Sequence, residues 1–144
     1  MKTIQLRSKE VKTLKEKFPF LTKDNMLTRE TEEGTKLYYQ NNEIVLAEKE
    51  GVTFPTLKSR AVLPQAVVDM GAVKFVTNGA DVMAPGVKEK PEYSEEDLLH
   101  VVDEKNRKKL AVVQALTSSS EFPEKGRAFK NLHWVGDKIW QQEV

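Results

Sequence analysis

The chain has no cysteine among its 144 residues and contains only two histidines. Disulfides and thiolate metal sites are therefore excluded, and the histidines alone form no zinc-binding spacing. The glycine patterns of Walker and dinucleotide-binding loops are missing, and Ser118–Ser120 lacks the glycines of a nucleophile elbow. We expect no metal, no cofactor and no catalytic residue, and hence a protein that is not an enzyme.

Long apolar runs are missing as well. No segment approaches the length of a membrane span, and the N-terminus lacks the apolar core of a signal peptide. We therefore expect a cytoplasmic protein without a membrane partner. The net charge is +1, but basic residues gather in the stretches 2–23, 105–109 and 125–130. Such clusters are more often solvated faces than sites, although three of them slightly favour an anionic partner.

The first part of the sequence predicts a small α+β unit with an antiparallel sheet. Residues 2–6 predict a strand, and Ser8 is the expected N-cap of a helix that ends at Phe18, before Pro19. Two apolar segments then flank Asn41 and Asn42, which predicts a hairpin because asparagine tolerates positive φ. Gly51 is expected to close its second strand, and the segment 53–57 is the expected domain boundary.

The second part predicts mostly short strands. Residues 60–63 are a strand or part of the connection, and 88–94 read as a loop. The segments 98–102 and 110–116 predict one hairpin, and 117–126 predict turns with about one helical turn. A closing hairpin is expected in which Gly136 and Asp137 join residues 131–135 to a last strand, 138–140.

The stretch VDMGAVKFVTNGADVMAPGV (residues 68–87) carries the densest local signals. Asp69 is a good N-cap, and three apolar residues after it, Ala72, Val73 and Val76, share one helical face. Gly79 stands where a left-handed residue is wanted. Val82 and Ala84 then alternate with Met83, as in a strand. The stretch predicts a short capped helix, then a strand that ends in a Pro-Gly turn, with an exposed helix end that suits a phosphate or ribose as well as packing.

The remaining polar residues favour structural roles. His100 and His133 lie in strand patterns, and we interpret both as surface or edge residues. The aspartates at positions 69, 81, 103 and 137 stand at the ends of predicted elements, which indicates capping and turn formation rather than a magnesium site.

Residues 68–87 resemble the signature of the PUA domain, an RNA-binding module of pseudouridine synthases and archaeosine transglycosylases. The segment LHWVGDKIW (residues 132–140) is similar to the closing hairpin of that domain. The N-terminal strand, the lysine-rich helix and the segment 55–57 resemble the pre-PUA plus PUA arrangement of the malignant-T-cell-amplified-sequence family and its archaeal relatives. The resemblance implies an α+β protein: a small N-terminal α/β-sheet domain (1–59) and a C-terminal PUA-like β pseudo-barrel with short helices (60–144).

The same resemblance implies a non-catalytic RNA-binding protein associated with translation. Its implied partners are structured RNA (tRNA or rRNA), the small ribosomal subunit and a translation-factor protein. The implied RNA-binding residues come from the helix, the Pro-Gly turn and the last strand: Gly71, Lys74, Asn78, Pro85, Gly86, Val87, Lys88 and Lys138. Each has a structural alternative; Gly71 serves either close helix packing or a backbone contact to RNA, and Pro85 and Gly86 serve the turn first. Trp140 is either a barrel plug, which we favour, or a stacking platform.

Two other functions stay open. The N-terminal unit is an alternative docking module for a partner protein, with Tyr38, Tyr39 and Phe54 as anchors, although two of the three are expected in the core. The chain is also a candidate RNA-targeting module that acts in trans with an RNA-modifying enzyme.

Overall fold

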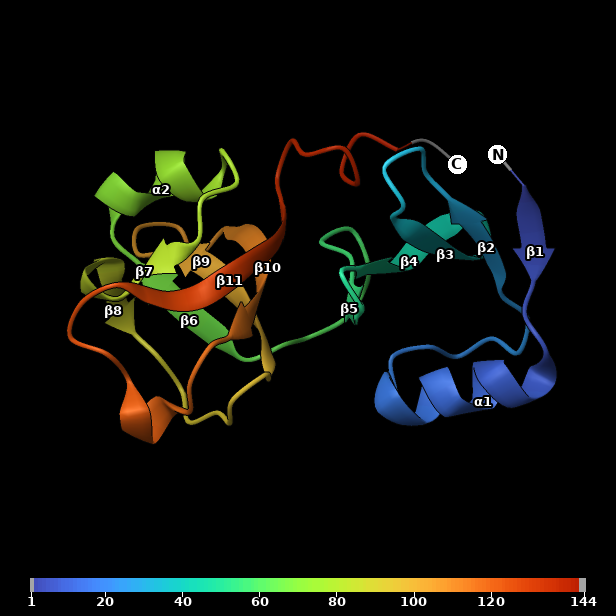
Figure 1. Cartoon of the computed structure of the whole chain (residues 1–144), viewed down its shortest axis with the longest axis horizontal. Helices are drawn as coiled ribbons and strands as arrows, with labels where there is room; N and C mark the ends of the chain where they lie inside the picture. The colour runs from blue at the N-terminus through green and yellow to red at the C-terminus, as the bar shows by residue number, and fades with distance from the viewer. Residues whose placement is uncertain (1, 143–144) are drawn as a thin grey trace. The chain divides into compact units, whose positions relative to one another are not determined.

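The computed structural model describes residues 2–142, which fall into two compact units. Residues 2–61 with Gln142 form the first unit, and Val62–Gln141 form the second. Each unit has its own sheet, and Figure 1 shows one helix beside each. The α+β class predicted from the sequence is confirmed. Neither helix within 2–142 has both the length and the apolar character needed to span a membrane.

The first unit is a five-stranded meander in which every strand pairs antiparallel with the next along the chain. Its strands are β1 (Thr3–Gln5), β2 (Leu27–Glu30), β3 (Lys36–Gln40), β4 (Glu43–Lys49) and β5 (Val52–Pro55). Helix α1 (Ser8–Lys17) follows β1 and has Phe18 as its C-cap, as predicted. The expected N-cap is wrong: Arg7 holds that position without a capping side-chain bond, and Ser8 is already helical.

The β3–β4 hairpin confirms the role predicted for its asparagines. Asn41 and Asn42 have φ of 49° and 61°, the left-handed conformations that a two-residue hairpin turn requires. Glu50 and Gly51, with φ of 53° and 81°, make the next tight turn into β5. The expected boundary at 53–57 therefore begins inside the sheet, because β5 pairs with β4. Strand β2 was not predicted from the sequence.

The proposed protein-docking anchors of this unit are not accessible. Tyr38, Tyr39 and Phe54 are all buried, with at most 7% of each residue exposed. The expectation that one of the three stays exposed is wrong, because β3 and β5 are each covered at these positions. No anchor for a partner protein remains among them.

The second unit is built on a six-stranded sheet with the order β7-β11-β10-β9-β6-β8. Its strands are β6 (Gln65–Val68), β7 (Val82–Met83), β8 (Val87–Glu89), β9 (Leu98–Asp103), β10 (Lys109–Ala115) and β11 (Arg127–Trp134). All neighbours are antiparallel except β6 and β9, which run parallel. Helix α2 (Met70–Val76) packs its apolar face, Ala72, Val73 and Val76, on the buried core of this sheet. Figure 1 shows α2 on the side of the sheet where β7 lies.

The central prediction for residues 68–87 is confirmed. Asp69 is the N-cap of α2, and Gly79 has φ of 94°. Val82 and Ala84 are buried while Met83 is 50% exposed, which is the alternation that the sequence predicts. The Pro-Gly turn is a short 3-10 helix, η1 (Ala84–Gly86). A second one, η2 (Ser119–Glu121), supplies the helical turn expected in 117–126.

The segment 60–63 forms no strand and is part of the connection, one of the two readings that the sequence left open. Two predictions for the second unit are wrong. Part of the expected loop 88–94 belongs to β8. The closing hairpin does not form either, because residues 135–141 make turns instead of a last strand. Asp137 explains this: its carboxylate accepts from the amides of Trp134 at 3.0 Å and Trp140 at 2.7 Å, which bends the chain where a strand was expected.

The two histidines are buried rather than at the surface or an edge. His100 on β9 and His133 on β11 are each 1% exposed, and both lie opposite Val112 on β10. His133 Nδ1 lies 2.8 Å from the Asp137 carboxylate. Burial tends to raise the pKa of Asp137, but the bonds from His133 and from the two amides outweigh it and hold this pKa below its usual value.

Candidate nucleic-acid interface

Two carboxylates from different parts of the chain accept hydrogen bonds from amides in the first turn of helix α2. Asp69 Oδ1 accepts from the amide of Ala72 at 2.9 Å, and Glu104 Oε2 accepts from the amide of Met70 at 2.9 Å. These acids satisfy amides that lack partners within the helix and complement its positive end. An exposed helix end for a phosphate was expected here, and this is wrong, because acidic groups already occupy that end.

The helix is locked to the Pro-Gly turn. The amide of Asp69 donates to the carbonyl of Gly86 at 2.9 Å, and Val68 pairs with Val87 where β6 meets β8. A Cβ atom on Gly86 would lie 3.3 Å from the Ala72 Cβ, so Gly86 permits close packing of turn and helix. The two predicted contact segments, 71–78 and 85–88, therefore form one continuous surface, which we call the α2–turn surface.

The far end of α2 is held by the last strand. Asn131 on β11 is buried, and its Nδ2 donates to the carbonyls of Val76 and Ala80, each at 3.0 Å. A Cβ atom on Gly79 would lie 2.7 Å from the ring of Trp134, closer than side chains tolerate. Gly79 is thus required twice, by its positive φ and by the indole against it.

The α2–turn surface exposes basic and aromatic groups next to each other. Lys74, Asn78, Pro85 and Lys88 are exposed, as predicted for contact residues. Lys74 Nζ lies 5.1 Å from the centre of the Phe75 ring, and Phe75 is 57% exposed. A cation over an accessible ring suits a phosphate and an unpaired base together, since phosphates attract the charge and bases stack on rings.

Gly71 is not needed for packing within the chain. A Cβ atom there would meet only Asp69 Oδ1, at an ordinary contact distance of 3.5 Å. The packing role that was one of its two possible explanations therefore has no support in the structure. Its missing side chain leaves the helix surface open beside Lys74.

Lys138 lies on a third segment. It is exposed and belongs to the turn after β11 rather than to a strand. Its neighbours Asp137 and Ile139 are both buried. The Asp137 carboxylate already contacts His133 and accepts hydrogen bonds from two main-chain amides. Trp140 is half-buried, so the structure shows neither a deeply buried plug nor a fully exposed platform.

Sequence reasoning missed two residues that shape this surface, Glu104 and Asn131. Phe75 and Met83 lie within the segments that were expected to contact RNA, but neither was singled out as a contact residue. An inward face at positions 72, 73 and 76 places Phe75 outside, and Met83, which was expected to point outward, is 50% exposed. Glu104 and Asn131 carried no local signal, since their partners stand 34 and 51 to 55 residues away.

Comparison with known proteins bears directly on this architecture. The family model of the PUA domain matches residues 64–133. An uncharacterized protein of Methanocaldococcus jannaschii is 49% identical over 112 residues, which cover 68% of this chain and 69% of that protein. The chain belongs to the PUA-domain family.

Other relatives extend over almost the whole chain. Translation machinery-associated protein 20 of Eremothecium gossypii is 30% identical, covering 97% of this PUA-domain protein and 89% of its own length. Malignant T-cell-amplified sequence 1-B of Xenopus laevis is 27% identical, with coverages of 98% and 91%. The crystal structure of a hypothetical protein from Pyrococcus horikoshii matches with a TM-score of 0.82 at 30% identity, covering 97% of this chain and 98% of that one.

Proposed function

We propose that this PUA-domain protein binds structured RNA of the translation machinery, a tRNA or an rRNA element, without catalysing a reaction. The observation that carries the proposal is the α2–turn surface, where Lys74 and Lys88 are exposed on segments locked together beside an accessible Phe75. The names of the relatives, which include a translation machinery-associated protein, support the same role. We further propose that the first unit is the pre-PUA domain.

The residues take separate roles in this proposal. Lys74 and Lys88 contact phosphates, and Phe75 stacks on an unpaired base, because unstacked bases are what proteins read in folded RNA. The open backbone at Gly71 and at Pro85–Gly86 lets the RNA approach closely, beside Val87 and Asn78. Lys138 adds a phosphate contact from the turn after β11.

Gly71→Ala is the sharpest test of this surface. Alanine is the better helix former, so the substitution should stabilise the protein by about 0.5 kcal/mol or leave it unchanged. RNA affinity should nevertheless fall, because the new methyl group stands where the RNA approaches. Fluorescence anisotropy with labelled tRNA and small-subunit rRNA fragments measures this. Unchanged affinity for every RNA that binds the wild type would contradict a contact at Gly71.

The charged contacts are tested by salt dependence. Lys74→Glu and Lys88→Glu should each weaken binding and each reduce the slope of log affinity against log salt by about 0.7 to 0.9. Lys12→Glu, on the exposed face of α1, is the matched control and should change neither. Absence of binding to tRNA and ribosomal subunits at low salt would refute the proposal.

Sequencing of RNA crosslinked to the protein then identifies the target. Crosslinks in small-subunit rRNA or at its tRNA sites support a role in translation. Crosslinks confined to one arm of a tRNA would instead support the alternative, an RNA-targeting module that acts beside a modifying enzyme.

A further inference from the structure

The hairpin that joins β9 to β10 ends in a basic turn. Its residues 104–108, which we call the hairpin tip, are all exposed. They include Lys105, Arg107 and Lys108, against a single acid, Glu104. The tip therefore carries an excess of positive charge, which the proposed function does not use.

The hairpin tip is held in one conformation by Asp103, the last residue of β9. Asp103 is buried. Its carboxylate accepts from the amides of Lys105 at 2.9 Å, Asn106 at 2.6 Å and Lys108 at 3.1 Å. These bonds, the Asn106 bond first, hold the pKa of Asp103 below its usual value although burial opposes them, so the carboxylate stays ionised. The amide of Arg107, at φ of 56°, donates to the carbonyl of Asp103 at 3.1 Å. An ordered turn therefore displays the two lysines.

The acidic groups of the hairpin are directed at main-chain amides instead of its lysines. The Asp103 carboxylate is occupied by the tip itself, and Glu104 Oε2 accepts from the amide of Met70 at 2.9 Å. Within residues 2–142, neither Lys105 nor Lys108 has an ion-pair partner. Their two charges are therefore not neutralised by the described part of the chain.

The hairpin tip adjoins the α2–turn surface. The amide of Glu104 donates to the carbonyl of Val68, the last residue of β6, at 3.0 Å. Val68 also pairs with Val87, where β8 leaves the Pro-Gly turn. Arg107 Nη2 lies 2.7 Å from the Glu89 carboxylate and so joins the tip to β8 as well. The tip, the start of α2 and the end of the Pro-Gly turn meet at one end of the sheet, and the tip extends the α2–turn surface.

We propose that the hairpin tip is a second phosphate-binding element for the RNA that the α2–turn surface binds, with Lys105 and Lys108 as the contact residues. The inference rests on the proposed function, because it concerns the same RNA. Phosphates repeat along every strand, so an RNA held at Lys74 and Lys88 offers further phosphates to the neighbouring tip. Since the phosphate is the same at every nucleotide, the tip adds affinity and orientation without selecting a sequence.

An acidic protein is the alternative occupant of the hairpin tip. The centre of a protein interface usually contains apolar or aromatic anchors that are buried on binding. Residues 104–108 contain none, since their sequence is Glu-Lys-Asn-Arg-Lys. Contact through exposed lysines alone is instead typical of binding to a nucleic-acid backbone.

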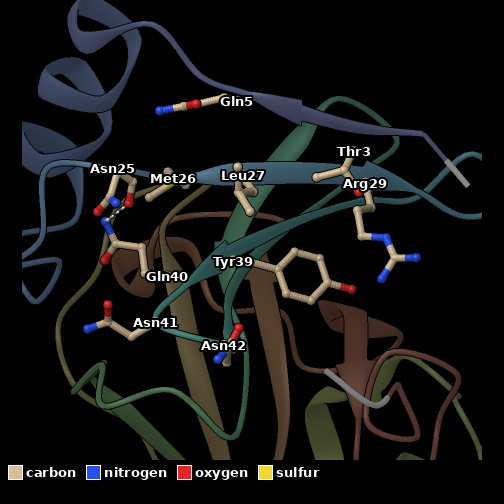
Figure 2. A pocket seen from close by; sticks show the side chains of 10 residues that line it. All are labelled: Thr3, Gln5, Asn25, Met26, Leu27, Arg29, Tyr39, Gln40, Asn41 and Asn42. Atoms are coloured by element: carbon tan, nitrogen blue, oxygen red, sulfur yellow. Dashed lines mark hydrogen bonds between the residues drawn. The ribbon is translucent and has the colours of Figure 1, made fainter.

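Basic residues of the first unit lack this arrangement. Figure 2 shows Arg29, the one basic residue among the described residues that line a pocket of about 410 Å³ on this unit. Its Nε is buried, and its guanidinium carbon lies 5.9 Å from the centre of the Tyr39 ring. Lys9 and Lys12 are exposed on helix α1. These two lysines provide a control with the same change of charge away from the candidate surface.

The first test is the salt dependence of RNA binding by Lys105→Gln/Lys108→Gln. Both positions are exposed, so the fold should be kept. Affinity at 0.1 M salt should fall about tenfold or more, and the slope of log affinity against log salt should fall by about 1.4 to 1.8, because each phosphate contact contributes about 0.7 to 0.9. Lys9→Gln/Lys12→Gln should change neither. Fluorescence anisotropy with the tRNA or rRNA fragment that the wild type binds measures both; equal losses in the two double variants, or no loss at the tip, overturn the proposal.

The second test locates the RNA. The chain has no cysteine, so a single introduced thiol can carry an iron–EDTA group that cleaves nearby RNA. Asn106→Cys places this group on the hairpin tip and leaves both lysines unchanged. It should cleave the bound RNA over a short stretch, whereas Lys12→Cys should not. Bound RNA that is not cleaved from position 106, or is cleaved equally from both positions, overturns the proposal.

Variants of the α2–turn surface separate this inference from the proposed function. If Lys74→Glu weakens RNA binding and the double variant of the tip does not, the tip assignment is wrong and the proposed function stands. If the wild type binds neither tRNA nor ribosomal subunits at low salt, both are wrong. If the tip variant keeps its RNA affinity but loses binding to polyglutamate, the tip is a docking surface for an acidic protein, and the proposal is wrong.

Discussion

Each unit of the protein contains a buried amide side chain that holds two main-chain carbonyls, and the two amides bridge very different stretches of sequence. Gln40 in the first unit reaches Lys23 and Asn25, which are 17 and 15 residues away. Asn131 in the second unit reaches Val76 and Ala80, which are 55 and 51 residues away. In the first unit Gln40 of β3 holds the segment that leads into β2, whereas in the second unit α2 of the candidate RNA surface is held by the last strand of the sheet.

The largest difference in lost stability is expected between substitutions at two glycines with positive φ, Gly79 and Gly51. Gly79→Val places a branched side chain at φ of 94° and against Trp134, so the second unit should lose about 4 kcal/mol. Gly51→Ala in the first unit has φ of 81° with nothing within 4 Å of the new Cβ, and should lose only about 1 kcal/mol. Urea unfolding measures both, by tryptophan fluorescence for the second unit, which contains both tryptophans, and by circular dichroism. Equal losses would show that the indole contact contributes nothing.

The next largest difference in stability is expected between substitutions of the two buried side-chain amides, Asn131 and Gln40. Asn131→Ala leaves two carbonyls without their donor and should destabilise the second unit by about 3 kcal/mol. Gln40→Ala should cost about 1 kcal/mol, because the chain it holds lies near the surface and water replaces the lost donor. Hydrogen exchange at the amides of Thr77 and Ala80 should accelerate in Asn131→Ala only. If both variants lose the same stability, the distinction between local and distant bridging is wrong.

His100 makes the second unit sensitive to acid. The pKa of His100 is lowered to about 4, first because burial disfavours the imidazolium and then because Lys109 and His133 repel its charge. The unfolded chain therefore binds this proton first, and stability present above pH 6.5 is lost as pH falls toward 4, by about 2 kcal/mol. His100→Leu should remove this loss in unfolding experiments at pH 7 and pH 4.5. The pKa of Asp137 is lowered instead from an ordinary acidic value, so its contribution disappears only at still lower pH.

The smallest effects concern the helix caps. Asp69→Ala removes the cap of α2 and should cost about 1 kcal/mol. Arg7→Asp gives α1 the side-chain cap that it lacks and should add about 0.5 kcal/mol. Thermal unfolding of the two variants compares the helices directly. A loss of stability in Arg7→Asp would mean that the arginine has a role that its exposed position does not reveal.

Local signals predicted the fold where neighbours in sequence are neighbours in space. The Asn41–Asn42 turn, the Asp69 cap and the positive φ of Gly79 each depend on a few adjacent residues. The same reasoning failed at residues 138–140. The Asp137 carboxylate accepts hydrogen bonds from the amides of Trp134 before it and Trp140 after it, and the chain forms a turn where a strand was expected.

The candidate site likewise combines features that local sequence signals predicted and features that depend on residues distant in the sequence. The sequence placed the candidate contact residues on the helix and the Pro-Gly turn, and the structure locks those two segments together through Asp69 and Gly86. It did not reveal that Glu104 accepts from the amide of Met70 at the start of α2.

By itself the sequence determined helix α1, the Asn41–Asn42 turn, the Asp69 cap and the apolar face of α2, because propensity, capping and periodicity act between residues that are close together in the chain. The tertiary structure decided what each polar group does. Asn131, Glu104 and His133 obtain their roles from strand order and burial, which bring distant residues into one low-dielectric environment where a hydrogen bond left unmade is destabilising.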